Sequence, residues 1–162
     1  MLEELQEKTK ETVSLAVLEG ATIRFVDCVE SLPSVRVGNR TGVVRPAHAS
    51  AVGKVILAQL PISEVERRYP EEDISAGTPA ALTDRRTLLR ELDEVRAQGY
   101  ALNWEESAEG LSAVAVALRT PAARRSPPWA SRHRAAGWAT SRRSGPSRPS
   151  CSRHPSGCRS GS

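Results

Sequence analysis

Residues 38–60 read GNRTGVVRPAHASAVGKVILAQL, and the other segments of the chain can be arranged around them. A glycine turn leads through a basic loop to Pro46, and a run with few polar residues follows as far as Leu60. Proline suits the first turn of a helix, because its missing N–H would have no partner there and its φ is already helical. The sequence therefore predicts a helix from Pro46 to about Gln59, and its apolar faces indicate that it is buried.

The first turn of this predicted helix, residues 47–50 (AHAS), is a candidate binding position. The backbone N–H groups of a first turn have no partner within the helix, and the helix macrodipole is positive there. A small anion or a carboxylate suits such a position. We therefore expect the N-terminus of the helix to face a pocket.

Strands are predicted on both sides of the helix. The segment TVSLAVL, residues 12–18, alternates with the period of a strand, and TIRFVDCVE follows at residues 22–30. Two such segments around a short glycine-containing link form a hairpin. A third short strand is predicted at residues 35–37, and two more at residues 100–104 and 111–119.

Further helices are predicted between these strands. A capping box that begins at Ser63 predicts a helix to about Tyr69. Thr83 or Asp84 caps the next helix, which ends before Gly99. With a short charged helix at the N-terminus, the order of elements indicates an α+β fold, with a mainly antiparallel sheet and helices packed on it.

Composition divides the chain into two unlike parts. Residues 1–120 hold 14 Lys and Arg against all 19 Asp and Glu, a net charge of −5, whereas residues 121–162 hold nine Arg and no acid. The second part also lacks Leu, Ile, Val, Met, Phe and Tyr, so it has little to bury against the entropy cost of ordering. We therefore predict a folded domain at 1–120 and an Arg/Ser/Pro-rich disordered tail at 121–162.

The location of the protein is expected to be the cytoplasm. No run of apolar residues approaches the length of a membrane span, and the charged N-terminus is unlike a signal peptide. The three cysteines give no disulfide framework. We predict no cofactor and no structural metal.

The order and spacing of several short motifs resemble one family. The motifs are ETVSLAV at residues 11–17, FVD at 25–27, PAHASAVGK at 46–54, and the pair EE with GL at 105–106 and 110–111. Together they resemble the C-terminal effector-binding domain of IclR-type bacterial transcription regulators, over roughly residues 5–120. The resemblance implies a GAF-like fold with a pocket between the curved sheet and the loop and helix of residues 38–60.

The resemblance also implies a ligand and the residues that bind it. The family's pocket takes small organic acids or aromatic metabolites, and in the intact family the sensor domains pair, which implies a homo-oligomer. The effector-binding residues carried over to this sequence are Ser34, Val37, His48, Ala51, Val52, Asn103 and Ala113. Many members carry an acid near Asn103 and a cysteine at Ala113, so the ligand itself is left open.

Two departures from the family lead to further expectations. The chain starts just after the point where the family's winged helix-turn-helix domain would end, so no specific DNA contact is expected from this fragment. Beyond residue 122 the family's last strand and helix are replaced by a sequence that is typical of a GC-rich gene read out of frame. We therefore predict a frameshift, an effector domain that is incomplete at its C-terminus, and weak or no effector binding.

Several side chains in the folded part have a structural and a functional interpretation. His48 is interpreted first as structural and second as a contact to an anionic ligand, and Lys54 as an exposed or paired lysine. Arg36, Arg40 and Arg45 either attract an acidic effector or are simply solvated.

Catalysis is not predicted. Cys28 with His48 would offer a thiol and a base, but no third orienting group is apparent. The pair Glu105 and Glu106 is interpreted as the solvated rim of a loop, because neighbouring residues of an extended chain face opposite ways.

Alternatives to effector sensing remain open. The tail has loosely zinc-like spacing at Cys151, His154 and Cys158, and its arginines would bind nucleic acid through phosphates. Both are interpreted as incidental properties of a basic coil. The main alternative is a non-functional fragment, or an interfering one that pairs with full-length regulators.

Overall fold

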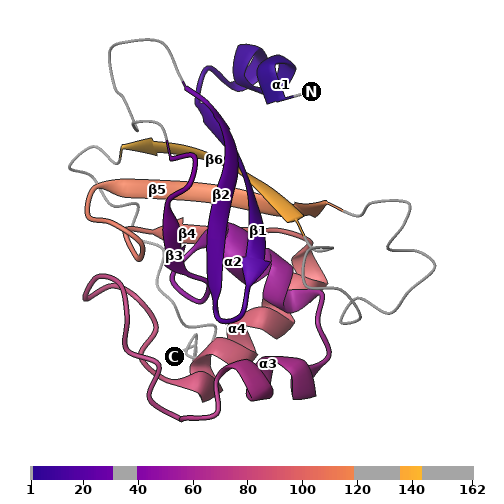
Figure 1. Ribbon diagram of the computed structural model, residues 1–162, viewed down its shortest axis with the longest axis vertical. Coiled ribbons are helices and arrows are strands. Elements are labelled where there is room, and N and C mark those ends of the chain that lie inside the picture. Colours follow the sequence, from indigo (N-terminus) through magenta and orange to yellow (C-terminus); the bar gives the residue numbers. More distant parts are fainter. Residues whose placement is uncertain (1, 31–39, 119–135, 144–162) are drawn as a thin grey trace, which may run out of the picture.

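A computed structural model describes residues 2–30, 40–118 and 136–143 of the 162-residue chain (Figure 1). The helices are α1 (Leu2–Thr9), α2 (Ala51–Ala58), α3 (Ile62–Arg68) and α4 (Arg85–Gln98). The strands are β1 (Thr12–Glu19), β2 (Thr22–Val29), β3 (Val44–Pro46), β4 (Ala101–Trp104), β5 (Leu111–Leu118) and β6 (Ala136–Arg143).

All six strands form one sheet, in the order β3-β2-β1-β6-β5-β4, and every neighbouring pair is antiparallel. One face of the sheet is covered by α2, with α4 and α3 beyond it (Figure 1). The prediction of an α+β fold with a mainly antiparallel sheet and packed helices is confirmed.

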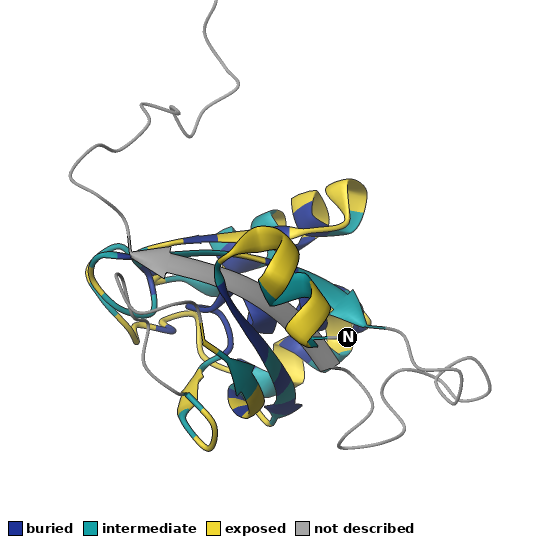
Figure 2. Cartoon of the chain, turned by 90° about the horizontal axis from the view of Figure 1, so that it is seen from above, coloured by how far each residue is buried: buried dark blue, intermediate teal, exposed yellow. Residues whose placement is uncertain are grey.

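The helix α2 lies at the centre of the core. All eight of its residues are buried, and it packs on β5 and on α4. By contrast α1, next to the N-terminus in Figure 2, has no buried residue. The apolar side chains around α2 include Ile23 and Phe25 of β2 and Leu88 and Leu92 of α4. The prediction of a buried central helix is confirmed.

The start of α2 differs from the prediction. Pro46 belongs to β3, where it pairs with Thr22, and the helix begins only at Ala51. The reason is tertiary: the N–H of Ala47 donates to the carbonyl of Ala21 at 2.9 Å, and the turn that follows folds back onto the helix at Gly53. A Cβ on Gly53 would lie 2.0 Å from the carbonyl oxygen of Ala47, so only glycine admits this approach.

Two other elements depart from the predictions. The strand predicted at residues 35–37 lies outside the described residues, and the third strand of the structure is β3. Helix α3 begins at Ile62 after Pro61, without a side-chain cap, so the predicted capping box at Ser63 is wrong. Its glutamate, Glu64, instead pairs with Arg67 at 2.8 Å and with Arg68 at 2.5 Å.

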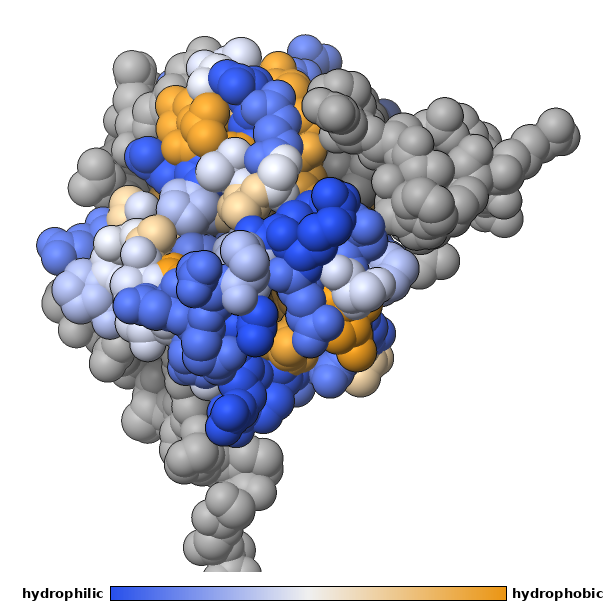
Figure 3. Space-filling model, turned by 60° about the horizontal axis from the view of Figure 1, so that its bottom comes forward, coloured by the Kyte–Doolittle hydropathy of each residue, from blue (hydrophilic) through white to orange (hydrophobic). Residues whose placement is uncertain are grey.

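Helix α4 agrees with the sequence in detail. The side chain of Asp84 accepts a hydrogen bond from the N–H of Thr87 at 2.7 Å, and Gly99 ends the helix in the left-handed conformation, with φ of 83°. The inward stripe of Leu88, Leu92 and Val95 is buried. The outer side of α3 and α4 faces solvent, and Figure 3 shows that this side of the molecule is largely hydrophilic.

The strand β6 falls within the stretch that the sequence predicts to be a disordered tail. It lies between β1 and β5 and pairs with both strands. Thr12 of β1 is paired with Ser141, and Leu118 of β5 is paired with Ala136. Without it, β1 and β5 would each leave a row of backbone groups unpaired, which is costly inside a sheet. The strand at residues 136–143 is not expected from the sequence, whereas the domain boundary at residue 120, the tail and the frameshift stay predictions.

The described part of the chain contains no helix that is both long and apolar enough to cross a membrane.

Candidate binding site

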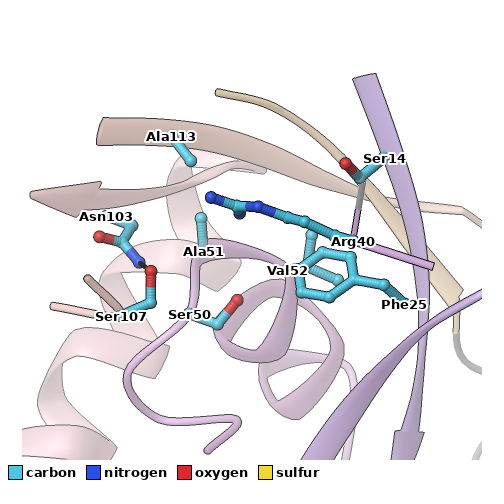
Figure 4. Close-up of a pocket in the computed structure, with 9 residues that line it drawn as sticks. All are labelled: Ser14, Phe25, Arg40, Ser50, Ala51, Val52, Asn103, Ser107 and Ala113. Atoms are coloured by element: carbon cyan, nitrogen blue, oxygen red, sulfur yellow. Dashed lines mark hydrogen bonds between the residues drawn. The ribbon is translucent and has the colours of Figure 1, made fainter. Parts of the chain in front are cut away.

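A small pocket lies between the N-terminus of α2 and the covered face of the sheet (Figure 4). Its walls come from four strands, from the start of α2 and from two loops. The lining residues are Ser14, Phe25, Arg40, Ser50, Ala51, Val52, Asn103, Ser107 and Ala113. Ser14 and Ala113 belong to β1 and β5, the two strands that flank β6.

The start of α2 gives the pocket a positive backbone wall. Ser50 occupies the cap position with an extended backbone, yet its side chain makes no capping hydrogen bond. The first N–H groups of a helix have no acceptor within the helix, and the macrodipole adds a partial positive charge. Ala51 and Val52, which follow Ser50, bring this turn directly to the pocket.

Arg40 adds a full positive charge to the same pocket. Its side chain extends between α2 and β5, and Cζ lies 5.6 Å from the centroid of the Phe25 ring (Figure 4). Burial lowers the pKa of the guanidinium, and the positive charge of Arg45 lowers it further. The nearby Cys28 acts in the opposite direction and raises that pKa. No hydrogen bond or ion pair joins this guanidinium to another described residue.

The opposite wall is formed by a hydrogen-bonded turn that begins at Asn103. The amide nitrogen of Asn103 donates to the carbonyl of Ala49 and to the hydroxyl of Ser107, both at 3.0 Å. Its amide oxygen accepts the N–H of Glu106 at 3.0 Å. Asn103 is 2% exposed, so this turn is fixed to the loop that precedes α2.

The pocket is nearly filled by its own side chains. Its free volume is about 10 Å³, which is room for a single water molecule. A larger ligand therefore requires a side chain to move. Among the described lining residues Arg40 has the longest flexible side chain, and it makes no polar bond to another described residue, so it is the first of them that would move.

The structure brings together four of the seven predicted site residues. Ala51, Val52, Asn103 and Ala113 all line the pocket. Ser34 and Val37 lie outside the described residues. His48 does not line the pocket.

His48 has a structural environment. It is 3% exposed, its Nε2 donates to the carbonyl of Ala76 at 3.3 Å, and its ring meets Tyr69 edge-on with centroids 5.7 Å apart. Burial raises the pKa of Tyr69 to about 12, and its hydroxyl donates to the carbonyl of Ala21 at 3.2 Å. Burial lowers the pKa of His48 below its usual 6.5, and the charge of Lys54 lowers it further. The hydrogen bond to Ala76 acts in the opposite direction and raises that pKa.

The burial of His48 predicts that this residue contributes to the pH dependence of the protein's thermal stability. In the folded chain His48 takes up its proton at a lower pH than in the unfolded chain, where it titrates near its ordinary pKa, so this residue removes stability as the pH falls below about 6.5. Burial raises the pKa of Glu106, which acts in the opposite direction as the pH falls. The diagnostic is therefore a difference between variants: His48→Gln should lose less Tm than the parent between about pH 7.5 and about pH 5.5. The control His154→Gln should follow the parent, and equal losses in His48→Gln and the parent would contradict the prediction.

Lys54 and Glu106 form an ion pair that the sequence shows only in part. Nζ of Lys54, at 0% exposure, lies 2.6 Å from Glu106 and 2.6 Å from Glu91. From the sequence, Lys54 is interpreted as an exposed or paired lysine; the pairing is confirmed, whereas the exposure is wrong because the side chain is fully buried. The interpretation of Glu106 as a solvated rim is wrong, because the turn at Asn103 directs it into the core, where it is 2% exposed.

Other lining residues have weak signals in the sequence. Ser14 occupies an inward position of β1 among apolar neighbours, and Phe25 is the only phenylalanine of the chain. Ser50 and Ser107 give no signal, because only the fold brings them to the pocket. Arg40 is one of three candidate arginines, and its position in the pocket distinguishes it from the exposed Arg45.

Neither catalytic nor metal chemistry is suggested by the described residues. The thiol of Cys28 accepts a hydrogen bond from Ser14 at 3.4 Å, whereas His48 is bonded to Ala76. No group of three or more metal-ligating side chains occurs among the described residues. The zinc-like spacing at residues 151–158 lies outside them.

Comparison with known proteins gives a consistent result. A family model described as bacterial transcriptional regulator IclR C-terminal matches residues 1–125. The regulator KdgR of Escherichia coli is 35% identical over 115 residues, which cover 71% of this chain and 44% of KdgR. The regulator Rv1719 of Mycobacterium tuberculosis is 36% identical over 118 residues, covering 73% of this chain and 45% of Rv1719. The chain thus spans less than half the length of these relatives.

Solved structures support the same assignment. The C-terminal domain of Escherichia coli KdgR is similar with a TM-score of 0.69 and 30% identity, over 86% of this chain and 75% of that one. A double mutant of the inducer-binding domain of PobR from Acinetobacter, in complex with 3-hydroxybenzoic acid, is similar with a TM-score of 0.74 and 28% identity. That match covers 91% of this chain and 82% of the PobR domain. The chain belongs to the IclR family of bacterial transcriptional regulators and corresponds to the C-terminal domain of that family.

Proposed function

We propose that this domain senses a small organic acid on behalf of a transcription regulator. The observation that carries the proposal is the Arg40 guanidinium, which lies in the pocket at the positive end of α2 without an acidic partner among the described residues. A guanidinium and a helix N-terminus both favour a negative charge between them. Among the described residues that line the pocket, none is acidic.

The lining also suggests how such an acid would be held. Its carboxylate would pair with Arg40, and its carbon skeleton would lie against Phe25, Val52 and Ala113. The hydroxyl of Ser50, which does not cap the helix, is available as a further polar contact. The complex of the PobR domain with 3-hydroxybenzoic acid supports a small carboxylic acid as the ligand.

The output of the domain is proposed to be transcriptional control in the cytoplasm. An effector with unequal affinity for two arrangements of paired sensor domains shifts the population between them, and with it the regulator's affinity for DNA. The names of the relatives, all regulators, support this role over catalysis. Because β6 completes the sheet beside the pocket, we propose that the domain binds its effector despite the weak binding expected from the sequence.

Replacing Arg40 tests the proposal directly. Isothermal titration of the full chain with pyruvate, gluconate, benzoate and 3-hydroxybenzoate should find at least one acid that binds. For that acid, Arg40→Ala should weaken binding by about 10-fold to 100-fold, because a charge-assisted hydrogen bond contributes roughly 1.5–3 kcal/mol. Arg40→Lys should lose less, because it keeps the charge and loses only the forked geometry.

Arg45→Ala is the matched control. Arg45 is an exposed arginine of β3 that reinforces the same local charge without lining the pocket. Its removal should change the affinity by less than about threefold, since exposed charges are screened by salt. Equal affinity in Arg40→Ala and the parent, or no binding of any of the four acids, would refute a carboxylate effector held by Arg40.

A further inference from the structure

A buried ion network lies directly behind the pocket. Its centre is Lys54, one turn along α2 from Ser50, whose carbonyl accepts the N–H of Lys54 at 2.9 Å. The Lys54 ammonium lies 2.6 Å from both Glu91 and Glu106 and donates to the carbonyl of Leu102 at 3.1 Å. One lysine thus joins α2, α4, β4 and the loop after β4.

The same loop forms a wall of the pocket. Glu106 offers its carboxylate to Lys54, while its N–H donates to the side chain of Asn103 at 3.0 Å and its carbonyl accepts the N–H of Thr78 at 3.0 Å. Asn103 in turn donates to the hydroxyl of Ser107. Asn103 is therefore linked to Lys54 through Glu106, and Ser107 is linked through Glu106 and Asn103.

The local backbone shows that this loop is tightly constrained. Glu105 has a φ of 61°, a conformation that is unfavourable for a residue with a side chain. Its carbonyl accepts the hydroxyl of Thr78 at 2.6 Å. Gly77, with a φ of 102°, lies so close that an added Cβ would be 2.6 Å from the carbonyl oxygen of Glu106. The position of Glu106 is thus determined from several sides.

Stability alone is a poor reason for such a network. Desolvating charged groups is expensive, and a well-packed apolar set of the same volume is often as stable as a buried ion pair. An ion network instead makes the positions of its members depend on one another, so a shift of one charged group is passed to its partners. The unequal burial of its ends is also notable, since Glu106 is 2% exposed and Glu91 is 25% exposed at the surface of α4.

We propose that Lys54 and Glu106 are positioning residues that couple the pocket to α4. They hold Asn103 and Ser107 in the geometry that the pocket requires, and they pass a change in that geometry to Glu91. The role as a readout of effector binding rests on the proposed function. The coupling itself does not, because it is a property of the empty domain.

A double-mutant cycle tests the coupling without any ligand. Asn103→Ala loosens the pocket end and Glu91→Gln removes the charge at the α4 end, and the two residues share no direct bond. Urea unfolding of the full chain should show a departure from additivity of about fivefold in the unfolding equilibrium constant. If Asn103→Ala does not fold, the milder Ser107→Ala takes its place.

The control cycle replaces Glu91→Gln by Glu64→Gln. Glu64 is also a helical glutamate in ion pairs, but its partners are Arg67 and Arg68 on α3. Its combination with Asn103→Ala should be additive to within about twofold. Additivity of Asn103→Ala with Glu91→Gln to the same degree would overturn the proposed coupling.

Hydrogen exchange tests the readout separately, with the tightest-binding acid of the four named above. Binding should slow exchange of the amides at residues 91–98 of α4, and Glu91→Gln should abolish that change while the acid still binds. An acid that binds without affecting α4 would refute the relay and leave the proposed function standing. A coupled cycle in a chain that binds none of the acids would refute the proposed function and leave the coupling standing.

Discussion

Replacing Lys54 by methionine is expected to lower the free energy of unfolding by about 3–5 kcal/mol, the usual result of removing one partner from a buried ion pair. Methionine approximates the length of the lysine side chain, so the change removes the charge with little change in packing. The carboxylate of Glu106, which is 2% exposed, would lose its cation and remain beside Glu91. The carbonyl of Leu102 would lose a donor as well.

The measurement is urea unfolding of the full chain, followed by circular dichroism. Lys8→Met is the matched control, because Lys8 is an exposed lysine of α1 and its replacement should change the free energy of unfolding by less than about 0.5 kcal/mol. A cost for Lys54→Met close to that of the control would show that Lys54 is not buried between two carboxylates.

A compensating variant separates charge from packing. Lys54→Met combined with Glu91→Gln and Glu106→Gln removes all three charges and keeps the approximate volumes. It should recover most of the lost stability, because a neutral set of similar shape is often as stable as the ion pair it replaces. It should not recover the coupling between Asn103 and α4, since that coupling depends on the charges. If the triple variant recovers neither the stability nor the coupling, Lys54 stabilises the fold through packing.

The elements that the sequence predicts well are those whose signals are local. Helix α4 has its N-cap Asp84 and its terminal Gly99 within its own segment, and both act as the sequence indicates. The hairpin of β1 and β2 turns at Gly20, whose φ of 63° meets a requirement visible in the sequence. Such features depend on residues close together in the chain, so no knowledge of the fold is needed to interpret them.

The features that the sequence does not predict depend on distant partners. Glu106 is in a charged loop, EESAEG, and only its contact with Lys54, 52 positions earlier, shows that it is buried. The strand β6 has a composition typical of a coil, and its place is set by the open edges of β1 and β5. The sequence does not show which of Arg40 and Arg45 lines the pocket, because the two have the same charge and lie close together in the chain. Only the fold directs Arg40 inward.

Replacing Gly53 by alanine is expected to lower the free energy of unfolding by about 3 kcal/mol, which is at the upper end of the usual cost of overpacking. The new Cβ would lie 2.0 Å from the carbonyl oxygen of Ala47 and 2.5 Å from its Cα. Both are backbone atoms, and the turn that contains them is held to the hairpin by the bond from Ala47 to Ala21. No side-chain rotation can relieve the contact, so either α2 or the turn must shift.

Gly99→Ala distinguishes this contact from the general cost of replacing a glycine. Gly99 has a φ of 83° and nothing within 4 Å of an added Cβ, so its replacement carries only the conformational cost of about 1–2 kcal/mol. Gly53 lies within α2, where alanine by itself would be the better helix former by about 1 kcal/mol. A cost for Gly53→Ala that exceeds that of Gly99→Ala can therefore come only from the contact with Ala47. A smaller cost would show that the turn does not pack on the helix as described.

The same change should also affect the pocket through a defined route. The turn displaced by Gly53→Ala carries Ala49, whose carbonyl accepts the amide of Asn103 at 3.0 Å. Moving Ala49 away leaves a buried amide without one of its acceptors and frees the turn of Glu106 and Ser107. Effector affinity measured under conditions where the variant is still folded should therefore fall by about 10-fold or more, whereas Gly99→Ala should leave it unchanged. Unchanged affinity in a folded Gly53→Ala would mean that the pocket tolerates movement of the 47–50 turn, and that Arg40 alone determines binding.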